Sequence, residues 1–268
     1  VLLEGIRRAT ADGINVRVFG PASEIDLPSI DRAELIDTVD FITNEDDPVP
    51  SVRSRKDSSI VRAVADVAAG NSSAVVSLGS TGATLAAATF GLKRSRGVKR
   101  PALAGVVPLP GKDVVFLDIG ANVEVRAQHL IQFAYLGSAF SQSVLGVESP
   151  TVGLLTVGEE SGKGREEFVE AHATLSGADE INFAGNIEGG DVPGGTVDVV
   201  VADGFTGNVV LKAMEGVVKL MSTSISEAAR RNPVSAIGGL MLKPALAGLK
   251  KDLHPDTTGG ALDRKSVV

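Results

Sequence analysis

The segment Val197–Asn208, VDVVVADGFTGN, runs a short apolar stretch into a loop of small and polar residues, and a long helical pattern follows it. The same order occurs four more times along the chain. The apolar stretches and their loops are Ala74–Leu78 with Gly79–Gly82, Val114–Leu117 with Asp118–Asn122, Val152–Val157 with Gly158–Gly164, and Ile181–Ala184 with Gly185–Gly190. This alternation predicts an α/β fold with a mostly parallel sheet and flanking helices.

The loops in this pattern predict where a ligand binds. If the strands are parallel neighbours, their carboxyl ends share one edge of the sheet, and open α/β sheets bind ligands just outside that edge. Backbone N–H groups at helix N-termini suit an anion such as phosphate. The sequence therefore indicates an α/β enzyme that holds a small anion.

The composition limits the class of protein. The 268 residues are 43% hydrophobic, which is enough for the core of a single α/β domain over residues 1–268. A net charge of −7 and an aromatic content of 4% argue against a nucleic-acid surface. The chain has no Cys, which removes disulfides, thiolate nucleophiles and thiolate metal ligands. No apolar run approaches the ~20 residues that span a bilayer.

After Asn208 the sequence changes character. Apolar residues recur at helical spacing from Val210 to Ile225, Asn232-Pro233 breaks that helix, and a second apolar stretch follows over Val234–Leu249. This pattern predicts a helical hairpin over about residues 207–252 that projects from the α/β body.

The loop Gly158–Gly164 places a lysine between glycines beside a strand end. It resembles a phosphate-binding P-loop, but the spacing is one residue short and Gly164, instead of Ser or Thr, follows Lys163. Lys163 is nevertheless well placed to meet an anion. The alternative is a solvated surface loop without a ligand.

The hexapeptide Asp203–Asn208 is the more specific signal. We expect Thr206 or Gly207 to cap the long helix, so that Asn208 lies in its first turn, where amide donors are free. We expect Phe205 to turn back into the core. An ordinary helix cap would explain Thr206 but not the whole hexapeptide.

Other polar residues near strand ends allow two interpretations. Asp118 and Asn122 flank a Gly-Ala turn. Asp118 could bind substrate or metal, or it could hold the neighbouring loop in place, and the second role is favoured. Glu159, Glu160 and Glu188 could act as acids or bases, but charged loop residues are usually only solvated. The three histidines have no metal-ligand spacing and no Ser lies in a nucleophile elbow, so we expect no metal site and no Ser–His–Asp triad.

Taken together, these loops resemble one family over nearly the whole chain, to about Gly260. The matching segments, in order, are Lys56–Ser59, Ser80–Ala83, Asp118–Asn122, Val157–Gly164, Phe183–Gly189 and Asp203–Asn208 with Val210–Lys212. The family is the bacterial phosphate acyltransferase of phospholipid synthesis, which converts acyl-acyl carrier protein and inorganic phosphate into acyl phosphate.

The resemblance implies a fold similar to isocitrate dehydrogenase and phosphotransacetylase, a homodimer, and a cytoplasmic location with peripheral contact with the membrane. Carried over by position, Lys163 and Asn208 are the implied catalytic residues. The residues implied to line the same cleft are Ser80, Thr81, Gly82, Asp118, Asn122, Gly185, Asn186, Glu188, Asp203, Thr206 and Gly207.

The sequence departs from the family pattern at three places. The family begins with a strand and an Asp-Ala-Met-Gly-Gly-Asp motif, which the sequence does not have before Val1, and Ser80 stands where the family usually has Asn. Gly259–Ala261 match, whereas Leu262–Val268 do not. From these departures we expect both chain ends to be incomplete.

The implied chemistry needs no covalent enzyme intermediate and no cofactor, because phosphate itself attacks the thioester. We expect Lys163 to neutralise phosphate charge, and Asn208 to donate a hydrogen bond to the phosphate or to the thioester oxygen.

The hairpin has a second interpretation at the membrane. Apolar residues flanked by Lys243, Lys250 and Lys251 suit shallow insertion into an anionic interface. These residues are Ile237, Leu240, Met241 and Leu242. The alternative is that they pack against the same hairpin of a dimer partner.

Three other functions stay open at this point. A short-chain phosphate acetyl- or butyryltransferase shares the chemistry and differs in the acyl donor. An isocitrate-dehydrogenase-like oxidoreductase would need a dinucleotide site, an arginine cluster and metal-binding aspartates, which are not clearly found. A membrane-associated scaffold is the non-enzymatic alternative.

Overall fold

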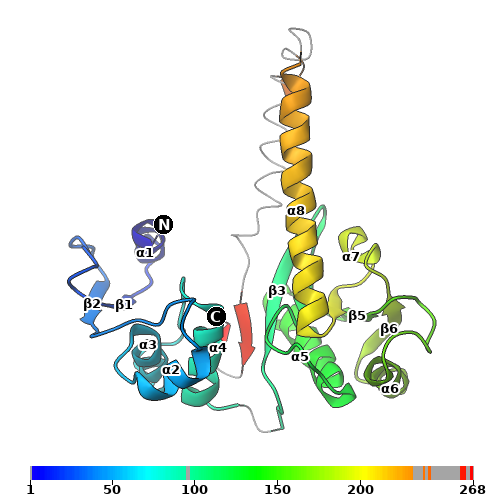
Figure 1. The fold of residues 1–268 in the computed structure, drawn as a ribbon, viewed down its shortest axis with the longest axis horizontal. Coiled ribbons are helices and arrows are strands. Elements are labelled where there is room, and N and C mark those ends of the chain that lie inside the picture. Colours follow the sequence, from blue (N-terminus) through cyan, green and yellow to red (C-terminus); the bar gives the residue numbers. More distant parts are fainter. Residues whose placement is uncertain are drawn as a thin grey trace. The chain divides into compact units, whose positions relative to one another are not determined.

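The structure is a computed structural model of the chain (Figure 1). It describes residues 2–94, 97–231, 238, 241–242, 260–263 and 266–267. The chain divides into two compact units, Val1–Pro101 with Asp263–Val268, and Ala102–Leu262. The single domain expected for residues 1–268 stays a prediction, and we describe each unit by itself.

In the described part of the first unit, four helices accompany a parallel pair of strands. Strands β1 (Val16–Gly20) and β2 (Ala33–Asp37) pair in parallel. The helices are α1 (Leu2–Ala11), α2 (Pro48–Ser54), α3 (Ser59–Ala68) and α4 (Thr81–Gly91). Buried side chains from α2, α3 and α4 share one hydrophobic core, which therefore holds these helices together.

The expected strand Ala74–Leu78 in this unit is wrong, because the segment is irregular. Of its apolar side chains, Val75 is buried and joins the helical core, whereas Val76 is 83% exposed and Leu78 is also exposed. One inward side chain is too little to hold a strand in a core. The loop after it still caps a helix, since Ser80 Oγ accepts a hydrogen bond of 3.3 Å from Ala83 N at the start of α4.

The second unit is built around a mostly parallel sheet, with the strand order β6-β5-β7-β4-β3-β8. Strands β4, β7, β5 and β6 are parallel neighbours, while β3 pairs antiparallel with β4 and with β8. The strands are β3 (Ala102–Leu109), β4 (Lys112–Leu117), β5 (Thr151–Leu155), β6 (Asn182–Ile187), β7 (Val199–Val201) and β8 (Gly260–Asp263). The last described strand is β9 (Ser266–Val267). The predicted fold class is confirmed.

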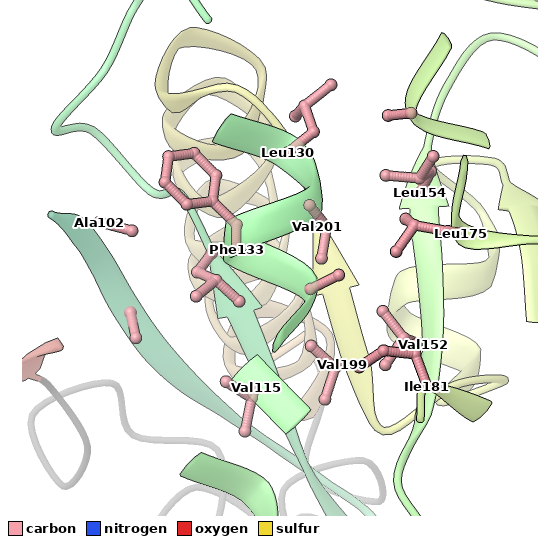
Figure 2. Close-up of a cluster of buried hydrophobic side chains, with 14 of the residues drawn as sticks. Ala102, Val115, Leu130, Phe133, Val152, Leu154, Leu175, Ile181, Val199 and Val201 are labelled. Carbon is pink, nitrogen blue, oxygen red and sulfur yellow. The ribbon is translucent and has the colours of Figure 1, made fainter. Parts of the chain in front are cut away.

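Helices cover both faces of this sheet. They are α5 (Ala127–Leu145), α6 (Glu166–Leu175), α7 (Asp191–Gly194) and α8 (Gly204–Ala229). Alternate residues of β4 point to opposite faces, so that Val115 and Leu117 face α5 and α6, while Val114 and Phe116 face α7 and α8. Figure 2 shows the first of these two clusters.

One glycine explains how closely α5 approaches the sheet. A Cβ added at Gly137 would lie 2.5 Å from Val199 Cγ1 and 2.7 Å from Leu117 Cδ2. The helix backbone therefore rests directly on β7 and β4. Leu130 and Phe133 of the same helix belong to the hydrophobic cluster that Figure 2 shows. This packing fixes the strands whose carboxyl ends carry the candidate site.

Helix α8 begins at the sheet and extends past it (Figure 1). Apolar side chains near its start, Val210, Leu211 and Met214, pack against the core, whereas Val217, Leu220 and Met221 are exposed further along. The first arm of the predicted hairpin is therefore a helix. Most of the second arm, including Ile237 and Leu240, lies outside the described residues. Within the part of the chain that the structure describes, no helix has the length and apolar character that a membrane span requires.

A polar cluster ties together the opposite, amino-terminal edge of the sheet. Asp198 Oδ2 accepts hydrogen bonds from Thr151 N (2.8 Å) and Thr151 Oγ1 (2.7 Å), and Lys112 Nζ lies 2.9 Å from Asp198 Oδ1. Burial alone would raise the pKa of Asp198, but the hydrogen bonds from Thr151 and the charge of Lys112 outweigh it and hold the pKa below the usual aspartate value.

This lowered pKa predicts how stability depends on pH. Ionised Asp198 contributes stability above its unfolded pKa of about 3.9, and that contribution is lost as pH falls through the lower folded pKa. In chemical denaturation, the free-energy difference between wild type and Asp198→Asn should therefore shrink between about pH 6 and about pH 2. Asp113→Asn, at an exposed position of β4, is the control. A constant difference for Asp198→Asn across that range would contradict the role of the cluster.

Candidate active site

The carboxyl ends of four parallel strands form one row in the second unit. Leu117 of β4 and Leu154 of β5 both pair with Val201 of β7, and Leu155 pairs with Ile187 of β6. The residues that directly follow the strands therefore lie side by side at one edge. They are Asp118, Thr156, Glu188 and Ala202. The prediction that these loops meet at one edge is confirmed for β4, β5, β6 and β7.

Asp118 is fully buried at this edge, and its carboxylate holds the loop that follows β4. Oδ1 accepts hydrogen bonds from Gly120 N (3.1 Å), Ala121 N (2.9 Å) and Leu103 N of β3 (3.1 Å). Oδ2 accepts from both the backbone N and the Nδ2 of Asn122, each at 2.7 Å. These contacts fit the loop-holding interpretation, and direct substrate binding by Asp118 and Asn122 stays a prediction.

The N-terminus of α8 packs directly on this loop. Gly204 N donates a 2.7 Å hydrogen bond to Asn122 O, and a Cβ at Gly204 would lie 2.8 Å from Asn122 N. A Cβ at Gly207 would overlap the backbone oxygen of Asp118. Glycine is therefore required at both positions of the Asp203–Asn208 hexapeptide for the helix to reach the loop.

Asp203 caps α8, so the expectation that Thr206 or Gly207 would do so is wrong. Its Oδ1 accepts from Thr206 N at 2.9 Å, and its Oδ2 accepts from Thr206 Oγ1 at 2.8 Å. The helix consequently begins at Gly204, three residues earlier than a cap at Thr206 would allow. Phe205 is 62% exposed and does not turn back into the core, because the capped first turn directs it outward.

The loop after β5 carries Lys163, and two hydrogen bonds to one carbonyl shape it. Glu160 O accepts from Lys163 N at 2.9 Å and from Asn186 Nδ2 at 2.7 Å. A Cβ at Gly158 would lie 3.0 Å from Lys163 Cγ, so the lysine stem passes over this glycine. Lys163 is exposed, as a side chain that meets an incoming anion must be.

Gly185 and Asn186 belong to β6, so the expected loop Gly185–Gly190 is corrected to one that starts at Glu188. The register between β5 and β6 shifts before Gly185, which has a φ of +98°. Glycine tolerates this left-handed conformation, and the irregularity leaves Asn186 in contact with the Lys163 loop. Glu188 is exposed, and its N donates to Asp191 Oδ2 at 2.8 Å.

Two residues that sequence reasoning assigned no role support these loops. Arg165, the N-cap residue of α6, contacts Asp203, with 2.7 Å between Nη2 and Oδ2. His172 Nδ1 lies 3.0 Å from Asn186 Oδ1, and its ring meets Phe183 edge-on. The available signal was position alone: Arg165 directly follows the Gly-Lys-Gly segment.

The remaining predicted residues lie on two helices, α8 and α4. Asn208 is exposed in α8, as its fifth residue and not in its first turn. Ser80, Thr81 and Gly82 lie in the first unit, at the start of α4, where a Cβ on Gly82 would meet Pro48 of α2 at 2.7 Å. Among the described residues, no group of three or more His, Asp or Glu side chains has the arrangement of a metal site.

The fold is shared with phosphotransacylases of known structure. A phosphotransacetylase from Streptococcus pyogenes superposes with a TM-score of 0.59 at 17% identity, covering 81% of this chain and 78% of that one. A branched-chain phosphotransacylase from Enterococcus faecalis V583 gives 0.56 at 18% identity, covering 80% and 79%. At these identities the likeness establishes the fold alone.

Sequence relatives are closer. Phosphate acyltransferase of Elusimicrobium minutum (strain Pei191) is 47% identical over 222 residues, which are 83% of this chain and 65% of that protein. That of Lactococcus lactis subsp. cremoris (strain SK11) is 44% identical over 252 residues, 93% and 74% of the two chains. That of Streptococcus pneumoniae (strain ATCC 700669 / Spain 23F-1) is 41% identical over 270 residues, 97% and 81%.

The model of the fatty acid synthesis protein family matches residues 1–262, and the chain belongs to this family. Membership agrees with the resemblance that the loop motifs carry. The chain spans between 65% and 81% of the length of the three relatives.

The contact of α8 with the loop after β4 predicts opposite effects for two glycines of one helix. Gly207→Ala should lower the free energy of unfolding by about 1–3 kcal/mol, because its Cβ overlaps a backbone oxygen that cannot move away. A Cβ added at Gly216 has no atom within 4 Å, so Gly216→Ala should raise the free energy of unfolding by about 0.5–1 kcal/mol, because alanine has the higher helix propensity. Denaturant titration of both variants checks this, and equal effects would refute the close packing at Gly207.

Proposed function

We propose that this chain transfers a fatty acyl group from acyl-acyl carrier protein to inorganic phosphate, giving acyl phosphate for phospholipid synthesis. The observation that carries the proposal is the row of loops after β4, β5, β6 and β7, where the start of α8 and the Lys163 loop meet at one edge. Family membership favours acyl transfer to phosphate over an oxidoreductase or a scaffold.

The reaction demands positioning more than strong acid or base catalysis. Phosphate is partly dianionic near neutral pH and attacks the thioester carbonyl carbon, and the thiolate of the carrier then leaves. The site must hold two partners in line and stabilise the oxyanion that develops on the carbonyl oxygen. Exposed Lys163 supplies a positive charge for phosphate, and the start of α8 adds the positive end of the helix dipole.

Asn208 has a different role in this proposal. Its carboxamide donates a hydrogen bond to the phosphate or to the thioester oxygen, where the negative charge grows during attack. Asp118, Asn186 and Asp203 are hydrogen-bonded to groups of the loops and of the neighbouring strands and helices, so these three residues shape the site around the reactants. Thr206 and Gly207 complete the turn that presents Asn208.

A homodimer in the cytoplasm with peripheral membrane contact belongs to the same proposal. Exposed apolar side chains along α8, such as Val217, Leu220 and Met221, offer a surface for a second copy. Met241 and Leu242 are also exposed, as lipid contact would require.

Acyl-phosphate formation from palmitoyl-acyl carrier protein, with acetyl-CoA in parallel, tests the proposed function. We expect phosphate-dependent product from the long-chain donor only. Product from acetyl-CoA only would instead make the chain a short-chain transferase. Wild-type protein without activity on either donor, under conditions where a relative is active, would overturn the proposal.

Lys163→Ala and Asn208→Ala should each lower kcat about a hundredfold, because each removes one aimed charge or donor worth about 3 kcal/mol in the transition state. Lys219→Ala, which removes an exposed lysine further along α8, is the matched control and should leave turnover within about twofold. Turnover of Lys163→Ala within about twofold of wild type would eliminate Lys163 from the mechanism.

A further inference from the structure

One arginine connects the two elements that carry the predicted catalytic residues. Arg165 follows Lys163 by two residues and is the N-cap residue of α6. Its Nη2 lies 2.7 Å from Oδ2 of Asp203, which caps α8, the helix that carries Asn208. The Lys163 loop and the start of α8 are therefore joined by a charge-assisted hydrogen bond.

The acidic partner in this pair is almost completely buried. The Asp203 side chain is 1% exposed, and both of its oxygens also accept hydrogen bonds from Thr206. A buried carboxylate is costly unless a positive charge and hydrogen bonds compensate it. Arg165 supplies that charge from the surface side, because its own side chain is 55% exposed.

Arg165 is itself held in place by two further contacts. Its Nε lies 3.0 Å from Glu167 Oε1, and its guanidinium carbon lies 5.3 Å from the ring centroid of buried Phe168. A planar guanidinium makes all three contacts at once, whereas a lysine ammonium could not. Three contacts therefore hold the guanidinium between the two elements.

We propose that Arg165 is a positioning residue, which fixes the start of α8 relative to the Lys163 loop through Asp203. This inference rests on the proposed function. Without Arg165, both elements keep their own residues, but the contact that fixes the position of one relative to the other is lost. Small displacements of catalytic groups lower the reaction rate by large factors. The phosphate-binding charge of Lys163 remains, so the loss falls on kcat and not on the KM for phosphate.

A double-mutant cycle separates this role from direct contact with phosphate. Arg165→Met, Asp203→Asn and the double variant are compared in the full chain, with palmitoyl-acyl carrier protein and varied phosphate. We expect each single variant to lower kcat at least about tenfold and to change the KM for phosphate by less than about threefold. The double variant should be no slower than the slower single variant, because the two residues act as one unit.

Arg165→Lys keeps the positive charge, and it is the check on whether Arg165→Met loses activity only because it does not fold. It should recover part of the lost kcat. Additive effects of Arg165→Met and Asp203→Asn would overturn the proposal, and so would a tenfold or larger rise in the KM for phosphate with kcat unchanged.

Lys112→Met is the matched control, since it breaks the 2.9 Å pair with Asp198 at the opposite edge of the same sheet. It should leave kcat within about twofold. Amide hydrogen exchange gives a readout that needs no turnover: Arg165→Met should speed exchange at Lys163 and Thr206 at least about tenfold, and Lys112→Met should not. If the wild-type protein makes no acyl phosphate, the proposed function is wrong. The amide hydrogen exchange rates at Lys163 and Thr206 still test whether Arg165 positions the two elements. Unchanged exchange in Arg165→Met would contradict this role.

Discussion

The carboxylate of Asp118 is the contact on which the candidate site depends. It lies at the end of a central strand, buried, and it accepts hydrogen bonds from the backbone of its own loop, from Asn122 and from Leu103 of the neighbouring β3. Buried backbone N–H groups must find partners, and here one carboxylate serves several of them. The loop shape that results is the surface on which α8 sits.

A second buried carboxylate continues this arrangement to the other side of the edge. Asp203 caps α8 and pairs with Arg165, so the loop after β4, the start of α8 and the loop after β5 form one connected set. Asn186 extends it to β6 through Glu160 O. Few of these groups remain available for a ligand. Lys163, Arg165 and Asn208 are exposed on these elements, and the family resemblance implies catalytic roles for Lys163 and Asn208.

Sequence reasoning succeeded where a pattern is local and repeated. Apolar stretches bounded by Gly, Asp and Asn predicted β4, β5 and β7 and the edge that their loops share, because strand burial and helix starts leave a readable pattern. It failed at Ala74–Leu78, where an apolar run has one inward side chain, and it did not predict the antiparallel hairpin of β3 and β4, which Pro110 and Gly111 connect. It also placed the cap of α8 at Thr206 or Gly207, whereas Asp203 caps the helix. The hydroxyl of Thr206 and the carboxylate of Asp203 are both capping groups, and the sequence alone did not distinguish them. Arg165 was missed because its partner Asp203 lies 38 residues further along the chain.

In the proposed function, inorganic phosphate binds where the Lys163 loop meets the start of α8. Amide NMR during a titration with inorganic phosphate tests this binding site. We predict saturable shifts at Lys163, Gly164, Thr206 and Asn208, with amides at the opposite edge, such as those of Thr151 and Asp198, unchanged. Saturable shifts at other helix starts, with the amides of Lys163 and Thr206 unaffected, would contradict the account.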